Sequence, residues 1–237
     1  MFEIELLIFI LDGSGSMKEK KANLLASLVK GVLKRLESSA TNETYRAALI
    51  YFATDALVEK EDEQIYLDLT TAIEKIKNPY ERLLRDVIYK NNPETINPII
   101  GNTNIFPVLT NTLKILIDFQ RDNSLPSDKR ATVFLFTDGH FHDLDNEAQE
   151  LINQIHSHPI SPTMATIAFG EDAKFDDLME MASETNDRQK RHLEIAQVLN
   201  HLPNSEKLFL MGHEGDEITE SKIEAIRNFL NTLTQTA

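Results

Sequence analysis

The sequence contains no cysteine, which excludes a disulfide framework and any metal site built from thiolates. It also lacks a long hydrophobic run, because the longest uninterrupted apolar stretch, residues 6–11, is too short to span a bilayer. Glu3 and Glu5 precede this stretch where a signal peptide would carry basic residues. With Met1 as the start of the chain, we therefore expect a cytoplasmic protein without a membrane span.

Basic residues are scarce as well, with 24 Lys and Arg against 38 Asp and Glu, so the formal net charge is −14. A nucleic-acid partner is not expected, because proteins that bind phosphate backbones need a basic surface. Hydrophobic residues make up 41% of 237 residues, which is enough to bury a large core. We expect a single domain over residues 1–237, and the oligomeric state stays open.

A polar cluster follows the first apolar run, in the stretch LLIFILDGSGSM over residues 6–17. A continuous apolar run is typical of a parallel strand that is buried on both faces, and open α/β sheets place their ligands beyond the carboxyl ends of such strands. Asp12, Ser14 and Ser16 supply only oxygen donors, which suit a hard cation such as Mg²⁺. Gly13 and Gly15 allow the backbone to turn tightly and to approach a bound group closely.

The rest of the chain alternates between strand and helix patterns, which predicts an α/β fold with a doubly wound, mostly parallel sheet and helices on both faces. Two short strands, residues 56–58 and 65–69, are predicted as a hairpin around a charged loop at an antiparallel edge. Further strands are predicted at residues 46–53, 130–137, 163–169 and 207–211. Helices are predicted at residues 18–37, 70–89 with a break at Asn78-Pro79, 101–120, 144–155, 175–182 and 219–233.

Three motifs together resemble a known family. Asp12, Ser14 and Ser16 match Asp-x-Ser-x-Ser, and Gly101-Asn102-Thr103 and Thr137-Asp138-Gly139 follow in that order. This combination resembles the metal-ion-dependent adhesion site (MIDAS) of von Willebrand factor A domains, also called vWA or integrin I-like domains. The first motif alone is a weak pattern, whereas all three in suitable context are specific. The single-domain form without a signal peptide resembles intracellular bacterial members.

The resemblance implies a Rossmann-like vWA fold with six strands in the order 3-2-1-4-5-6 and an antiparallel edge strand. The strands that end at Asp12 and Asp138 would then be neighbours, and their carboxylates would repel one another without a cation between them. Region 78–100 is expected to be a local insertion near the site. The implied metal ligands, for Mg²⁺ or alternatively Mn²⁺ or Ca²⁺, are Asp12, Ser14, Ser16, Thr103 and Asp138.

In the resembled family the two serine hydroxyls bind the metal directly, the two aspartates act through water and hydrogen bonds, and the threonine does either. The implied function is protein–protein interaction, in which an acidic side chain of a partner protein completes the metal coordination. A rim that contacts this partner is expected from Gly15, Met17, Asn102, Asn104, Gly139, His140 and His142, with a packing residue as the other interpretation of Met17.

Each motif also has an interpretation without a metal. Asp12 and the serines could cap the following helix, Thr103 could cap another, and Asp138-Gly139 could be an ordinary turn. The stretch that contains His140, His142 and Asp143 could instead bind Zn²⁺.

Two further function classes remain as alternatives. A metal-dependent hydrolase or phosphoryl-transfer enzyme would use the cation to activate water or a phosphoryl group. However, an aspartyl phosphatase needs a second carboxylate where this chain has Ser14, and no Walker A loop, His-Glu-x-x-His or Gly-x-Ser-x-Gly motif is present. Enzyme activity is therefore not expected. The other alternative is a scaffold subunit that binds through another face.

Overall fold

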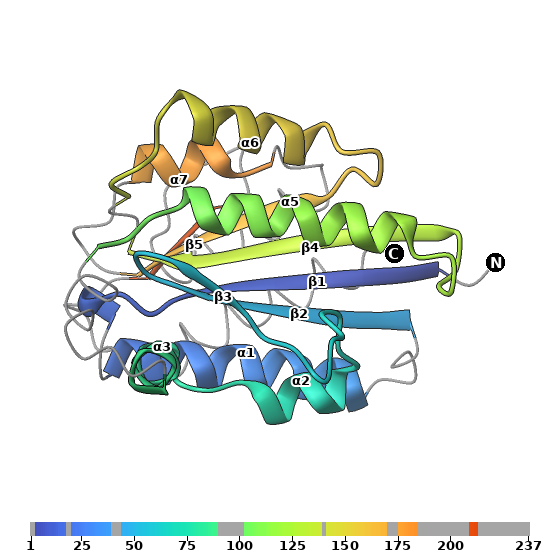
Figure 1. Ribbon diagram of the computed structural model, residues 1–237, viewed down its shortest axis with the longest axis horizontal. Helices are drawn as coiled ribbons and strands as arrows, with labels where there is room; N and C mark the ends of the chain where they lie inside the picture. Colours follow the sequence, from blue (N-terminus) through green and yellow to red (C-terminus); the bar gives the residue numbers. More distant parts are fainter. Residues whose placement is uncertain are drawn as a thin grey trace, which may run out of the picture.

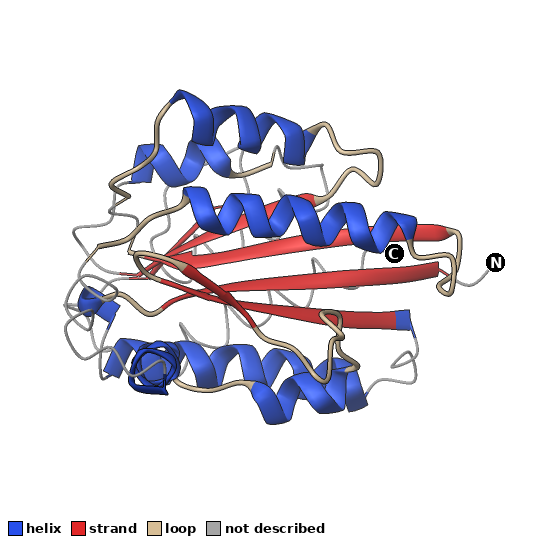
Figure 2. Cartoon of the chain, viewed as in Figure 1, coloured by secondary structure: helices blue, strands red, loops and turns tan. Residues whose placement is uncertain are grey.

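A central β-sheet lies between two layers of helices (Figure 1). The computed structural model describes residues 3–17, 20–38, 44–89, 102–138, 141–169, 175–183 and 209–212. The predicted α/β class, with a mostly parallel sheet covered by helices on both faces, is confirmed (Figure 2).

The first strand, β1 (Glu3–Asp12), runs through the middle of the sheet. Its apolar side chains alternate between the two faces, so Leu7 and Phe9 enter one core while Leu6 and Ile8 enter the other. All four are fully buried. The prediction that the uninterrupted apolar run forms a strand covered on both sides is confirmed.

The sheet order is β3-β2-β1-β4-β5-β6, and all neighbouring pairs are parallel except β2 and β3. Leu11 of β1 lies opposite Phe136 of β4, so Asp12 is level with the end of β4. The polar residues that follow these two strands therefore gather at one edge of the sheet. The strand bounds are Tyr45–Phe52 for β2, Ala56–Val58 for β3, Asp128–Thr137 for β4, Thr163–Phe169 for β5 and Phe209–Gly212 for β6.

Helices cover each face of the sheet with the apolar stripes that the sequence predicted (Figure 1). One layer contains α1 (Lys20–Ser38), α2 (Leu69–Lys75) and α3 (Pro79–Tyr89). The other layer contains α5 (Phe106–Arg121), α6 (Asn146–His156) and α7 (Phe175–Met181). The closing helix predicted at residues 219–233 lies outside the described residues. Of the insertion expected at residues 78–100, residues 90–100 also lie outside them.

The predicted hairpin between residues 56–58 and 65–69 is wrong. The strand β3 pairs antiparallel with β2, and Leu67 forms a single antiparallel bridge with Ala47 of β2. The extended segment ends there because Asp68 caps α2, with its carboxylate accepting a hydrogen bond of 2.8 Å from the backbone N–H of Thr71. Both segments therefore pair with β2, and no strand pairing between them is found in the described part of the chain.

The predicted break in the helical stretch 70–89 is confirmed, and the buried Tyr51 stabilises it. The Tyr51 hydroxyl donates to the carbonyl of Lys75 at 3.3 Å and accepts from the backbone N–H of Lys77 at 3.0 Å. These backbone groups are left free where α2 ends, so one side chain from the sheet satisfies both. The junction between α2 and α3 is thereby fixed on the sheet.

No helix in the described part of the chain combines the length and hydropathy needed to cross a membrane. The cytoplasmic location stays a prediction.

Replacing Tyr51 with Phe is expected to lower the free energy of unfolding by about 1 kcal/mol, because the Lys77 N–H loses its acceptor. Urea denaturation measures the change. The matched control is Tyr66→Phe, because the Tyr66 ring packs on Phe119 and its hydroxyl makes no hydrogen bond with a described residue. Equal losses for the two variants would show that the hydroxyl of Tyr51 has no special role.

Candidate metal centre

Asp12 is the last residue of β1, and its side chain is completely buried. Its Oδ1 accepts a hydrogen bond of 2.8 Å from the Ser14 backbone N–H, and its Oδ2 accepts one of 2.6 Å from the Thr137 hydroxyl. Burial, followed by the negative charge of Asp138, raises the pKa of the Asp12 carboxyl to about 7, and the hydrogen bonds from Thr137 and Ser14 partly oppose this. A positive charge at this place would favour the ionised form.

Asp138 follows directly after β4 and is also buried. Its Oδ1 forms no hydrogen bond with any described residue, although buried carboxylate oxygens are normally satisfied. An unsatisfied acidic oxygen beside a second buried carboxyl group is costly unless a cation or a proton lies between them. The two aspartates therefore fit a cation in a way that an ordinary turn does not explain.

The two serine hydroxyls come together on the turn that follows β1. Ser14 Oγ and Ser16 Oγ are 3.0 Å apart, and the short 3₁₀ helix η1 (Gly15–Met17) carries Ser16. The Met17 backbone N–H donates to the Ser14 carbonyl at 3.0 Å, which closes this turn. Ser14 is buried and Ser16 is exposed, so the pair extends from the carboxylates to the surface.

Thr103 lies in the loop before α5 and is buried. Its backbone forms a parallel β-bridge with Phe141, three residues after Asp138. The His142 backbone N–H donates to the Thr103 carbonyl at 3.0 Å, and the Thr103 N–H donates to His142 Nδ1 at 3.4 Å. The second sequence motif is therefore joined to the segment that directly follows the third.

Asp143 strengthens the same junction. Its two carboxylate oxygens accept hydrogen bonds from the backbone N–H groups of Ile105, at 2.6 Å, and Phe106, at 2.9 Å. These groups lie at the amino end of α5, where the partial positive charge of the helix favours a carboxylate. The role of Asp143 was missed in the sequence, although Ile105 at the N-cap of α5 has no side chain able to cap the helix.

The loop that carries Thr103 is also tied to the end of β2. The Asn104 backbone N–H donates to the Ala53 carbonyl at 2.8 Å, and Asn104 Nδ2 donates to the Thr54 carbonyl at 3.1 Å. Thr103 is thus held from both sides, by the loop after β2 and by the loop after β4.

Gly13 is needed for a reason that the sequence did not reveal. A Cβ atom at this position would lie 2.7 Å from the Pro79 carbonyl oxygen and 2.7 Å from Leu83 Cδ1, which is too close for any side chain. The Gly13 backbone N–H also donates to the Phe52 carbonyl at 2.8 Å. The close approach at Gly13 is therefore made by α3, which packs directly on the loop that carries the serines.

The expected partner-contacting rim is only partly placed at the surface. Met17 is wrong as a rim residue, because its side chain is fully buried in the core on the α1 side of the sheet. Asn102 and His142 are exposed, while Asn104 is half-buried and used in the hydrogen bonds above. Gly15 lies half-buried in η1, and Gly139 and His140 lie outside the described residues.

The zinc alternative gains no support from the described residues. His142 Nδ1 accepts the Thr103 N–H, and both oxygens of Asp143 cap α5. No group of three His, Asp or Glu side chains in the described part of the chain could hold a metal ion.

Comparisons with known proteins agree with the fold. Residues 7–85 match the model of the family described as von Willebrand factor type A domain. The sequence has no significant match among curated proteins.

Three solved structures illustrate the likeness. Proximal thread matrix protein 1 from the mussel byssus, with a zinc-occupied MIDAS motif, superposes with a TM-score of 0.57 at 15% identity over 98% of this chain and 46% of that chain. The von Willebrand factor type A protein from Catenulispora acidiphila superposes with a TM-score of 0.58 at 15% identity, over 98% of this chain and 43% of that chain. Manganese-loaded TRAP protein from Plasmodium vivax superposes with a TM-score of 0.52 at 15% identity, over 97% of this chain and 74% of that chain.

The chain spans less than half the length of the first two of these structures. At such identities the likeness establishes the fold, which is an α/β fold of the vWA type.

Replacing Asp143 with Ala is expected to raise hydrogen exchange at the Ile105 and Phe106 amides, because both lose their acceptor. The free energy of unfolding should fall by about 1 kcal/mol, as for other lost helix caps. Exchange mass spectrometry and urea denaturation measure the two effects.

The matched control is Asp145→Ala, because Asp145 also accepts two backbone N–H groups, from Glu147 and Ala148, but at the start of α6. It should lose a similar free energy and leave exchange at residues 105 and 106 unchanged. Increased exchange at these amides in both variants would contradict a specific role for Asp143.

Proposed function

We propose that this protein is a vWA interaction module that binds an acidic side chain of a partner protein through a divalent cation. One observation carries the proposal: the Asp138 carboxylate is buried beside Asp12 with an oxygen that no described group satisfies. The proposed ligands are Asp12, Ser14, Ser16, Thr103 and Asp138.

The chemistry of these residues supports Mg²⁺, with Mn²⁺ or Ca²⁺ as alternatives. Two carboxylates and three hydroxyls form an all-oxygen set, which hard cations prefer. The mussel protein has a zinc-occupied MIDAS and the TRAP structure is manganese-loaded, which supports a divalent ion without selecting one metal. When bound, the cation supplies a positive centre that attracts a carboxylate oxygen of the partner.

The chain's own residues prepare this centre. Hydrogen bonds to Ser14 and Thr137 orient the Asp12 carboxylate, so its oxygens need no rearrangement. The bonds from Asn104 and His142 keep Thr103 at the same edge of the sheet. Such preorganisation lowers the cost of binding.

The same contacts argue against the enzyme alternative. Each oxygen of Asp12 accepts one hydrogen bond, which lowers its nucleophilicity while leaving a lone pair for a cation. The neighbouring imidazole of His142 uses Nδ1 as an acceptor for Thr103. Ser14 occupies the position where an aspartyl phosphatase would carry its acid–base carboxylate. Binding without catalysis is therefore the function we propose.

Replacing Asp138 with Asn should change stability in opposite directions with and without metal. In EDTA the variant should melt at the same temperature as the wild type or higher, because a buried unsatisfied carboxylate is removed. Saturating Mg²⁺ should stabilise the wild type by about 3 kcal/mol at a hundredfold excess over Kd, and the variant hardly at all.

Thermal melts by calorimetry measure both effects. The control Asp118→Asn, in the middle of α5, should keep the full response to Mg²⁺. A variant at Asp138 that responds to Mg²⁺ like the wild type would exclude this residue as a ligand.

Partner capture should depend on the same ion. Immobilised protein is expected to retain a partner from a lysate of its source cells in Mg²⁺, to release it in EDTA and to regain it when Mg²⁺ is restored. Ser14→Ala should retain nothing, because one hydroxyl of the pair is lost, and Asp118→Asn should behave like the wild type. Capture that persists in EDTA and in Ser14→Ala would favour the scaffold alternative.

A further inference from the structure

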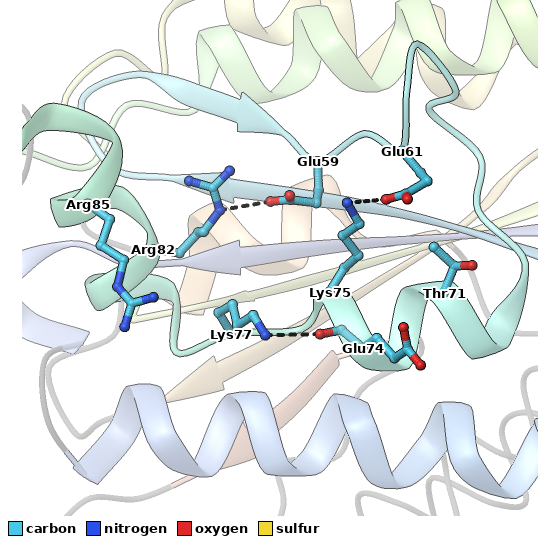
Figure 3. Close-up of a pocket in the computed structure, with 8 residues that line it drawn as sticks. All are labelled: Glu59, Glu61, Thr71, Glu74, Lys75, Lys77, Arg82 and Arg85. Atoms are coloured by element: carbon cyan, nitrogen blue, oxygen red, sulfur yellow. Dashed lines mark hydrogen bonds and ion pairs between the residues drawn. The ribbon is translucent and has the colours of Figure 1, made fainter. Parts of the chain in front are cut away.

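A charged pocket lies between the loop after β3 and the helices α2 and α3 (Figure 3). Its volume is about 780 Å³, far more than a single ion needs. All of the side chains that line it are polar or charged: Glu59, Glu61, Thr71, Glu74, Lys75, Lys77, Arg82 and Arg85.

The pocket has four cationic and three anionic side chains, in a chain whose net charge is −14. Arg82 Nε forms an ion pair of 2.8 Å with Glu59 Oε2, and Lys75 pairs with Glu61, so these charges are largely neutralised (Figure 3).

The other two cations of the pocket have no carboxylate partner among the described residues. Lys77 Nζ donates to the backbone carbonyl of Glu74 at 3.0 Å. Arg85 is exposed, and its guanidinium extends from α3 (Figure 3). After the two ion pairs the pocket keeps two cations, Lys77 and Arg85, and one anion, Glu74, so a net positive charge remains to attract an anion from outside.

Helix α3 brings this pocket next to the candidate metal centre. Pro79 and Leu83 leave no room for a Cβ atom on Gly13, so α3 touches the loop between Asp12 and Ser14. Arg82 and Arg85 lie within one turn of Leu83, and one helical turn rises only about 5 Å. A chain that reaches the metal centre could therefore also reach the pocket.

The backbone around the pocket is fixed before any ligand binds. Tyr51 holds the backbone at Lys75 and Lys77. Asn78 Nδ2 donates to Asn23 Oδ1 of α1 at 2.9 Å, and Asn78 Oδ1 accepts from the Glu81 N–H at 3.1 Å. The cations are thus presented by an ordered surface, which reduces the entropy lost on binding.

We propose that this pocket is a second subsite for the same partner, and that Lys77 and Arg85 bind an Asp or Glu side chain that flanks the carboxylate at the metal. The inference rests on the proposed function. A protein with a net charge of −14 repels an acidic segment at long range, so local cations beside the metal centre are needed to attract one. Arginine is suited to this role because its guanidinium binds a carboxylate through two parallel hydrogen bonds.

Fluorescence anisotropy with two labelled peptides tests the proposal. Hexaglutamate can fill both subsites, whereas a glycine–serine peptide of equal length with one central glutamate can fill only the metal. In Mg²⁺ the wild type should bind hexaglutamate about thirtyfold more tightly than the single-glutamate peptide, which exceeds the roughly sixfold statistical advantage of six glutamates over one. Arg85→Glu should reduce this ratio to about the statistical factor and leave Mg²⁺-dependent binding of the single-glutamate peptide in place.

Arg121→Glu is the matched control, because it makes the same change of charge at another exposed arginine. Arg121 lies in the last turn of α5, at the opposite end of this helix from the candidate metal centre. It should keep the wild-type ratio. An unchanged ratio in Arg85→Glu, or no binding of hexaglutamate by the wild type, would overturn the second subsite. A failure of the proposed function gives a different result from a failure of the second subsite. In that case the single-glutamate peptide would not bind, or its binding would not change in EDTA.

Discussion

Two buried acidic side chains at the ends of neighbouring parallel strands are the constraint on which the site depends. The register of β1 and β4 brings Asp12 level with the end of β4, and Asp138 follows one residue later. In this dry environment two negative charges repel strongly unless a positive charge lies with them. The neutral hydroxyls around them add oxygen donors without adding charge, so the carboxyl pair sets the electrostatic character of the whole edge.

Backbone hydrogen bonds between loops keep this edge in shape. The segment 102–106 meets the loop after β2 through Asn104 and the loop after β4 through His142 and Asp143. Each contact uses groups that would otherwise lack partners at a strand end or a helix start. The three sequence motifs are therefore parts of one cross-linked surface, although they lie far apart in the chain.

Much of this arrangement could be predicted from the sequence, because apolar runs and helical periodicity are local signals. The run before Asp12 predicted a strand buried on both faces, and the break before Pro79 predicted two helices. The failures have non-local causes. The side chain of Met17 enters a core formed by residues distant in sequence, and residues 65–69 are shaped by a bridge to Ala47 and the cap at Asp68.

The role of Asp143 depends on a helix that starts 37 residues earlier in the chain, and no local pattern reports such a contact. The same is true of the pocket between α2 and α3, whose cations are dispersed among acidic residues in the sequence. The metal ligands themselves follow from the resemblance of three motifs and stay a proposal.

The lack of any space at Gly13 means that the turn after β1 and the start of α3 form one mechanical unit. A displacement of either one must be transmitted to the other, because the Pro79 backbone packs directly on the backbone of Gly13.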